Sequence, residues 1–378
     1  MEKVKLNEVT WFQEGPGVRN TQYTESGIKL LNVANLVNGK VVLSNTSRYI
    51  SEDEALGKYK HFLCDEGDLI IASSGIKVEY LDKKMGFITK DMLPLCMNTS
   101  TIRFKVKDEN QLDIKYLMYF FKSNIFKDQI QKLITGSAQL NYGPSHLNKV
   151  FIKMNSMEKQ KEIVKKLDKI TSMIENQEEQ IKKYDDLVKS QFIEMFGDPL
   201  SNHKYELQEL NSVCDVRDGT HDSPKYHDTG YPLITSKNII DGMISFENVN
   251  LISQEDYDKV NQRSFVDNGD ILMPMIGTIG NPVIVNKTRD FAIKNVALIK
   301  FHKDSRIINY FLYHLMKSES FENYLKTNNK GGTQKFVSLG IIRKTKIITP
   351  PIELQNQFAD FVKHIDKLKL NDMLMEVA

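Results

Sequence analysis

Apolar and polar residues follow two different patterns along this chain. Short apolar runs bounded by Gly, Asn and Asp predict β-strands, because β-branched and apolar residues between turn formers are typical of strands. These runs lie at 30–33, 41–43, 69–72 and 101–106, and again at 233–235, 271–275, 283–285 and 297–301. Apolar residues spaced by three or four positions predict helices at 114–121 and 308–316. Each half of the chain is therefore expected to be a mixed α and β domain.

A heptad pattern runs through residues 157–196 and predicts one long helix. At about 1.5 Å per residue it would span roughly 60 Å, more than a compact domain covers, so it needs a partner along its length. Residues 352–378 repeat the pattern in a shorter segment that follows two prolines. We expect the two helices to pack as an antiparallel coiled coil. Its seam is predicted to contain Ile163, Leu167, Ile170, Ile174, Ile181, Phe358, Ile365 and Leu368.

The sequence also repeats itself. Residues 27–41 (GIKLLNVANLVNGKV) reappear as residues 230–244 (GYPLITSKNIIDGMI), and later blocks recur in the same order. Those blocks are the Gly-Asp pairs 67–68 and 269–270, segments 98–104 and 295–301, and the Lys-Ser pairs 122–123 and 317–318. A period near 200 residues is too long for a solenoid.

The repeat therefore predicts two copies of one domain-plus-helix unit. The expected class is α+β, with two α/β domains that are related by a pseudo-twofold axis and separated by the two long antiparallel helices. The expected segments are a first domain (1–155), a central helix (156–197), a second domain (198–351) and a C-terminal helix (352–378).

Composition narrows the class of protein. The 378 residues are 40% hydrophobic and 26% charged, as in ordinary water-soluble domains, and the net charge of +2 requires any nucleic-acid surface to concentrate its lysines and arginines. Three scattered cysteines argue against a disulfide framework or a zinc site. No apolar signal core begins the chain, and no apolar run is long enough for a membrane span. We expect a cytoplasmic protein with no membrane partner.

The sequence contains none of the common catalytic motifs that were sought. A glycine-rich nucleotide loop, a Walker lysine and an HExxH motif are all missing. Asp68 and Asp270 follow a glycine and precede a strand, which favours a turn over a metal-nuclease site. Two alternatives stay open beside DNA recognition: a fused nuclease or methyltransferase, and a coiled-coil scaffold.

Matching loops in the two halves are rich in side chains that hydrogen-bond in two directions. Asn and Gln pair with adenine, Arg and Lys pair with guanine or phosphate, and Thr offers a methyl and a hydroxyl group. The loops are polar in both halves but differ in content, as two readers of different sequences require. The predicted DNA-binding residues are Arg19, Asn20, Asn32, Asn35, Ser74, Lys77, Gln139, Asn141, Tyr142, Thr220, His221, Lys225, Ser236, Lys237, Asn238, Thr278, Lys294, Lys330, Thr333, Gln334 and Lys335.

Four stretches resemble the specificity (S) subunits of type I restriction–modification systems. They are 218–242 (DGTHDSPKYHDTGYPLITSKNIIDG), 269–282 (GDILMPMIGTIGNP), 350–355 (PPIELQ) and 157–168 (MEKQKEIVKKLD). The resemblance covers nearly the whole chain, and the repeated order of the blocks makes it specific.

The resemblance implies two target-recognition domains, each reading one half of an asymmetric, bipartite site in double-stranded DNA. It implies helices that fix the spacer and bind two methyltransferase (M) subunits, which restriction (R) motor-nuclease subunits join. The chain itself would be non-catalytic and hold no cofactor. S-adenosylmethionine, ATP and magnesium would belong to the partner subunits.

Overall fold

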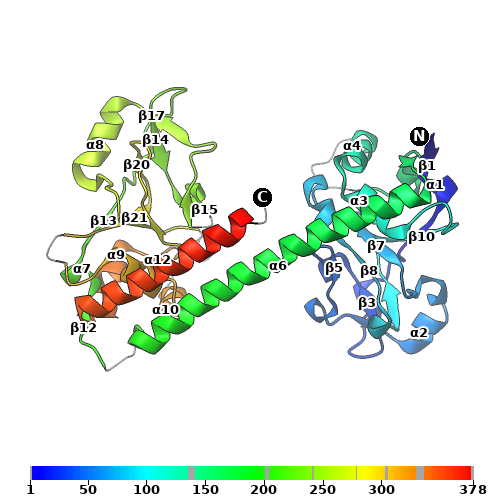
Figure 1. The fold of residues 1–378 in the computed structure, drawn as a ribbon, viewed down its shortest axis with the longest axis horizontal. Coiled ribbons are helices and arrows are strands. Elements are labelled where there is room, and N and C mark those ends of the chain that lie inside the picture. Colours follow the sequence, from blue (N-terminus) through cyan, green and yellow to red (C-terminus); the bar gives the residue numbers. More distant parts are fainter. Residues whose placement is uncertain are drawn as a thin grey trace. The chain divides into compact units, whose positions relative to one another are not determined.

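The computed structural model describes residues 2–134, 141–200, 204–240, 242–277, 279–302, 305–328 and 336–375. The chain forms two compact units, Met1–Ser172 and Met173–Ala378, and the boundary between them falls inside the long helix α6 (Met157–Phe196) (Figure 1).

The first unit is built on an antiparallel sheet with the order β2-β10-β7-β8. These strands are β2 (Thr10–Glu14), β10 (Thr101–Val106), β7 (Leu69–Ala72) and β8 (Met85–Phe87). A second sheet has the order β6-β3-β9, in which β3 and β9 are parallel. Its strands are β6 (Tyr49–Ile50), β3 (Ile28–Leu31) and β9 (Leu95–Met97). The pairs β1 (Glu2–Lys5) with β11 (Phe151–Met154), and β4 (Leu36–Val37) with β5 (Lys40–Val41), complete the strands.

Five helices accompany these strands in the described part of the first unit before α6. They are α1 (Leu6–Val9), α2 (Glu52–Leu56), α3 (Ile114–Lys122), α4 (Asn124–Leu133) and α5 (Pro144–Leu147). Buried residues of β7, β10, α3 and α4 form one core, in which Phe104, Phe121 and Phe126 pack ring against ring. This core holds the strand ends and loops in place.

The second unit repeats both sheets. Its antiparallel sheet has the order β13-β21-β18-β19, with β13 (Asp215–Asp218), β21 (Val296–Lys300), β18 (Ile271–Pro274) and β19 (Val283–Ile284). Its second sheet has the order β17-β14-β20, and β14 and β20 are again parallel. These strands are β17 (Asn250–Ile252), β14 (Tyr231–Ile234) and β20 (Ala292–Ile293).

Two short strand pairs and, between α6 and α12, five helices complete the described part of this unit. The pairs are β12 (Leu207–Glu209) with β22 (Lys346–Ile348), and β15 (Ile239–Ile240) with β16 (Met243–Ile244). The helices are α7 (Leu210–Val213), α8 (Gln254–Ser264), α9 (Asn309–Met316), α10 (Glu319–Thr327) and α11 (Leu339–Lys344). The two units thus share sheet order and strand direction, which confirms the predicted duplication.

The repeated Lys-Ser pairs prove to be helix caps. The hydroxyl of Ser123 accepts a hydrogen bond from the backbone N–H of Phe126 at the start of α4, and Ser318 does the same for Phe321 in α10. Such caps satisfy a backbone donor that the first turn of a helix leaves free. Both phenylalanines are fully buried, so each cap also fixes an aromatic side chain of the core.

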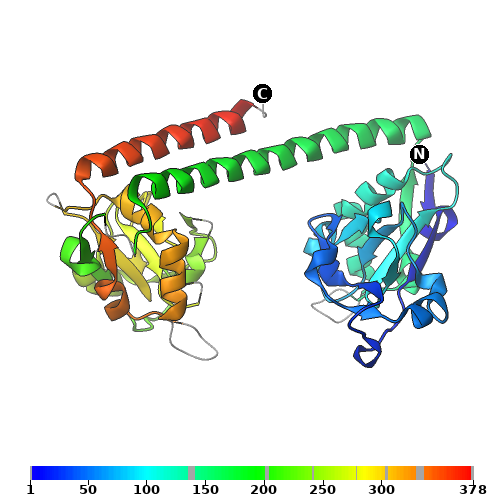
Figure 2. The ribbon, with the colours of Figure 1, turned by 90° about the horizontal axis from the view of Figure 1, so that it is seen from below.

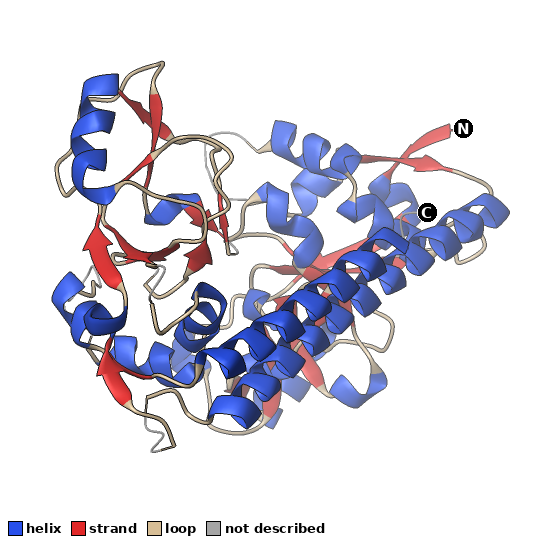
Figure 3. Cartoon of the chain, turned by 60° about the vertical axis from the view of Figure 1, so that its left-hand side comes forward, coloured by secondary structure: helices blue, strands red, loops and turns tan. Residues whose placement is uncertain are grey.

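Within the second unit, the last part of α6 packs antiparallel to α12 (Ile352–Met375), as Figures 2 and 3 show. The Tyr184 hydroxyl donates to the Asp372 carboxylate at 2.7 Å, while the Phe192 ring stacks edge-on against Phe358, with 5.3 Å between ring centroids. Phe358 and Ile365 are buried and Leu368 is half-buried, as expected for a seam.

The predicted seam does not extend along the whole of α6. Ile163, Leu167 and Ile181 are half-buried, but Ile170 and Ile174 are each 52% exposed. The reason is length: α12 has 24 residues against 40 in α6, and it has already reached Asp372 where it meets Tyr184. The expectation that these two isoleucines pack against the C-terminal helix is therefore wrong.

Candidate nucleic-acid interface

A buried polar turn follows β3 in the first unit and β14 in the second. In the first, the Asn35 side chain accepts from the backbone N–H of Asn32 at 2.9 Å and donates to the Val42 carbonyl at 2.9 Å. In the second, Asn238 accepts from the backbone N–H of Thr235 at 3.0 Å. Asn35 has no exposed surface and Asn238 is 8% exposed.

These asparagines shape the loop and do not project from it. Asn32 is buried as well: its amide donates to the Leu30 carbonyl at 2.9 Å, and its side-chain oxygen accepts from Asn98 at 2.9 Å. Three predicted DNA-binding residues, Asn32, Asn35 and Asn238, are therefore reassigned to the scaffold. Their side-chain groups satisfy backbone groups that would otherwise be buried without partners.

Tyr142 is a further correction. Its side chain is buried, and its hydroxyl donates to the Ala72 carbonyl at 3.0 Å at the end of β7. Burial raises the pKa of Tyr142, so the hydroxyl stays neutral and acts as a donor. Val337 takes the corresponding place in the second unit: its N–H donates to Met275 as that of Tyr142 does to Ser73. An aliphatic residue in one copy was the signal that this tyrosine belongs to the core.

A basic groove of about 590 Å³ opens in the first unit. Its lining is Val37, Asn38, Gly75, Ile76, Lys77, Tyr80, Lys83 and Lys84. Tyr80 is 48% exposed, the Lys77 ammonium lies 3.4 Å from the Glu79 carboxylate, and Lys84 donates to the Leu36 carbonyl at 2.8 Å. Exposed aromatic rings beside lysines suit nucleic acid, because bases stack on the rings and phosphates pair with the ammonium groups.

Only Lys77 of this groove was among the predicted DNA-binding residues. Tyr80, Lys83 and Lys84 were missed, although the run KVEYLDKK places an aromatic residue among lysines and so carried the signal. Ser74, next to the groove, is half-buried and donates to the Ser100 hydroxyl at 2.6 Å. Asn141 is exposed and forms a β-bridge with Ser74, while Arg19 and Asn20 are exposed on a separate loop.

The second unit gathers several of its predicted residues at the end of β13. The His221 ring lies 2.8 Å from the Asp218 carboxylate through one nitrogen and 2.8 Å from the Asn295 side-chain oxygen through the other. The hydrogen bond to Asn295, together with the Asp218 carboxylate, raises the pKa of His221. The Arg263 guanidinium also pairs with Asp218.

Backbone contacts bring this loop against β20. Thr220 donates its N–H to the Ile293 carbonyl at 3.0 Å, and the Lys294 ammonium donates to the Ser223 hydroxyl at 2.6 Å. A side chain on Gly219 would meet the Ile293 carbonyl oxygen at 2.2 Å, so only glycine permits this approach. Thr220, His221 and Lys294 thus form one polar surface. Lys225 and Lys237 are exposed, and Ser236 is half-buried in the turn after β14.

Six predicted residues lie outside the described part of the chain. They are Gln139, Thr278, Lys330, Thr333, Gln334 and Lys335.

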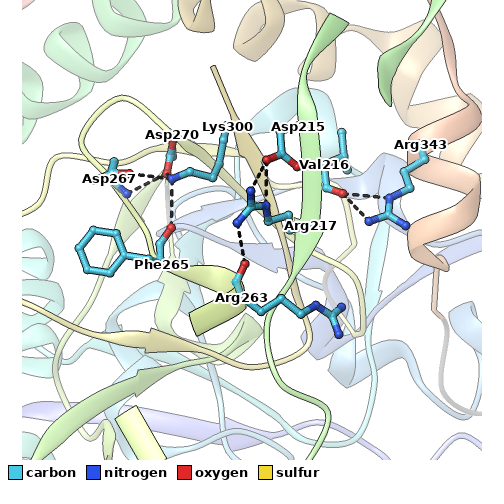
Figure 4. A network of polar contacts seen from close by, with 9 residues as sticks. All are labelled: Asp215, Val216, Arg217, Arg263, Phe265, Asp267, Asp270, Lys300 and Arg343. Carbon is cyan, nitrogen blue, oxygen red and sulfur yellow. Dashed lines mark hydrogen bonds and ion pairs between the residues drawn. The ribbon is translucent and has the colours of Figure 1, made fainter. Parts of the chain in front are cut away.

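Ion pairs beneath these surfaces repeat between the units. Asp270 is nearly buried, accepts the backbone N–H of Asp267 at 2.8 Å and pairs with Lys300 at 2.7 Å (Figure 4). Burial raises the pKa of Asp270, and Lys300 opposes that shift. Arg217 pairs with Asp215 of the same strand, β13 (Figure 4).

In the first unit, Asp68 accepts from the backbone N–H of Asp65 at 2.8 Å and pairs with Arg103 at 3.1 Å. Both Gly-Asp pairs are therefore turns closed by a cation, as the sequence favoured. Within the described residues, no group of three or more His, Cys, Asp or Glu is arranged to hold a metal ion. In that same part of the chain, no helix is long and apolar enough to cross a bilayer.

The model of one protein family, the type I restriction modification DNA specificity domain, matches residues 1–183 and again residues 202–374. The chain belongs to this family. The resemblance inferred from the sequence is thereby confirmed, and the two matches coincide with the two copies seen in the fold. A DNA specificity domain is a recognition module, so membership places the chain with non-catalytic subunits.

Individual relatives agree with the family. The chain is 30% identical over 189 residues to the type I restriction enzyme MjaVIII specificity subunit of Methanocaldococcus jannaschii. That alignment covers 48% of this chain and 43% of the relative, so the chain spans less than half the length of the curated relative it matches.

Solved structures share the fold over nearly the full length. The S subunit of a type I restriction–modification system from M. genitalium matches 99% of this chain and 91% of its own, with 15% identity and a TM-score of 0.53. A structure described in terms of complex assembly and conformational transition of the type I R-M system matches 100% of this chain and 93% of its own, at 16% identity and a TM-score of 0.52. These likenesses show that the specificity-subunit fold is common to all three chains.

Proposed function

We propose that this chain is the DNA-recognition subunit of a type I restriction–modification complex and reads an asymmetric, bipartite site, one half-site per domain. The observation that carries the proposal is the duplication of the domain with unlike exposed loops. The two units share sheet order, buried turns and acid–cation pairs, so their frames are equivalent. Their exposed surfaces differ, so the sequences that they read differ as well.

The exposed surfaces of the two units differ in side-chain chemistry. The first unit offers a lysine-lined groove with the exposed ring of Tyr80. The second offers Thr220, His221 and Lys294, where the buried Asp218 carboxylate and the Asn295 side chain hold the His221 ring through both of its nitrogens. Lysines position phosphates, whereas the hydroxyl and methyl groups of threonine contact base edges. Two such surfaces favour a target that is not a palindrome.

The helices are proposed to dock two methyltransferase subunits, to which restriction subunits bind. Supporting this, Ile170 and Ile174 of α6 are half-exposed, and large exposed apolar side chains on a helix are typical of a surface that meets a partner. S-adenosylmethionine, ATP and magnesium would be used by those partners. A cytoplasmic location remains a prediction.

Footprinting of the assembled methyltransferase complex on target DNA tests the proposal. Two separate protected patches are expected, with an unspecific segment between them. A single continuous footprint would contradict it. The enzyme alternative is tested with the purified chain alone, given S-adenosylmethionine or magnesium and mixed-sequence DNA; methyl transfer or cutting by this chain would favour that alternative.

A further inference from the structure

A buried glutamine lies in the first turn of α6. Gln160 has no exposed surface, and its side chain makes three hydrogen bonds. Its oxygen accepts from the backbone N–H of Asp113 at 3.0 Å, and its amide nitrogen donates to the carbonyls of Gln111 and Asn155 at 2.8 and 2.9 Å. One side chain therefore joins the helix to the segment just before α3 and to the segment that leads into α6.

The same arrangement occurs at the start of α12. Gln355 has no exposed surface; its oxygen accepts from the backbone N–H of Ile308 at 2.9 Å, and its amide donates to the carbonyls of Arg306 and Pro350, both at 2.8 Å. Each of these residues is the repeat counterpart of one in the first unit, in the same order along the chain. We call Gln160 and Gln355 the helix-root glutamines.

Glutamine is well matched to this position. The site needs one acceptor and two donors on a single planar group, and the side chain must reach from a helix to two loop carbonyls. Glutamate has a similar shape but, when ionised, no donor for those carbonyls. A fully buried amide with all these bonds is costly to disturb, because each group left unpaired loses its hydration without compensation.

We infer that the helix-root glutamines are positioning residues that set the spacer length of the DNA site. This inference rests on the proposed function. The reason is leverage: a tilt of about 4° at the root of α6, which is roughly 60 Å long, moves its far end sideways by about 4 Å, and the same tilt of α12, roughly 36 Å long, moves its end by about 2.5 Å. One base pair rises by about 3.4 Å, so a small change at a root is comparable in size to one base-pair step.

The test uses the complete complex with its methyltransferase subunits. The target site is first mapped with the unaltered chain, and methylation is then measured on DNA whose spacer is native, one base pair shorter or one base pair longer. The variants are Gln160→Ala, Gln160→Glu and Gln355→Ala, with Gln180→Ala, an exposed glutamine of α6, as the matched control. Gln160→Glu keeps the shape but places a carboxylate oxygen against two carbonyl oxygens. Gln355→Ala, at the other root, therefore serves as the informative variant if the Gln160 variants do not fold.

Each root variant is expected to lower the preference for the native spacer by roughly threefold to tenfold, as loss of one or two net hydrogen bonds implies. The bases required in both half-sites should stay the same, and Gln180→Ala should keep the full preference. Unchanged spacer preference in the folded root variants would overturn the inference, as would loss of half-site sequence preference. If the unaltered chain directs no split site at all, the proposed function fails instead, and the two failures are therefore distinguishable.

Discussion

The sequence pattern predicts that Asn35 contacts DNA, but in the structure its side chain stabilises a buried turn. Its amide is fully buried and bonded on both sides within its own turn. Asn238 takes the same role in the second unit. Asp68 and Asp270, and the helix-root glutamines, behave alike: polar residues kept in both copies are buried and satisfy backbone groups.

For this reason, Asn35→Ala is expected to destabilise the first unit by about 1–3 kcal/mol, the usual cost of leaving buried partners unsatisfied. Chemical unfolding monitored by circular dichroism would measure the change. Asn20→Ala, at an exposed loop position, is the control and should leave the free energy of unfolding nearly unchanged. A loss of DNA binding by Asn35→Ala at full stability would show that our reassignment is wrong.

Lys83 lines the basic groove of the first unit and is exposed. If its ammonium group neutralises one phosphate, Lys83→Ala should weaken DNA binding across all sequences and reduce the slope of log affinity against log salt by about 1. Fluorescence anisotropy at several salt concentrations would measure both. Lys183→Ala, on the exposed surface of α6, is the control, and equal salt slopes for both variants would argue against a DNA contact in the groove.

His221 predicts a pH dependence. Its partners raise the pKa of His221 in the folded state. They therefore stabilise the protein fully below the pKa of the unfolded state, about 6.5, and this stabilisation is lost as the pH rises through the raised pKa of the folded state. The melting temperature of the wild type should therefore exceed that of His221→Asn by more at pH ~5.5 than at pH ~8.5, two values on either side of the titration. A difference that does not vary with pH would rule out this coupling.

At the scale of elements, the local sequence pattern predicted where strands and helices lie but not how the strands pair. The expected strands at 69–72 and 101–106 are β7 and β10, and the expected helix at 114–121 is α3 with one residue more. Strand order was beyond such reasoning, because the parallel pairing of β3 with β9 joins segments far apart in sequence. Tyr142 was misassigned since an aromatic residue in a polar loop gives no local sign of burial. Comparison of the two copies, rather than either copy alone, holds that information.

Two of the apolar heptad residues of the long helix α6, Ile170 and Ile174, are each 52% exposed. Ile170→Glu and Ile174→Glu should therefore leave the melting temperature of the isolated chain almost unchanged, since both side chains are half-exposed. Co-purification with the methyltransferase subunits should fall sharply. Lys165→Glu, at a polar exposed position of the same helix, is the control. Normal assembly by both isoleucine variants would place the docking surface elsewhere.

At the scale of the whole molecule, the two units are copies of one scaffold, and sequence divergence has given them different exposed surfaces. The sheets, the serine caps, the acid–cation pairs and the helix-root glutamines are shared. The groove around Tyr80 and the cluster around His221 are not. Sequence specificity is therefore expected to change when these unlike surfaces are exchanged, and stability is expected to change when the shared residues are altered.

Mapping the methylated bases that the assembled complex leaves across a genome tests the central claim most directly. Our account predicts one motif made of two unlike sequence blocks, separated by an unspecified gap of constant length. A single continuous motif, or two identical blocks arranged as a palindrome, would contradict it.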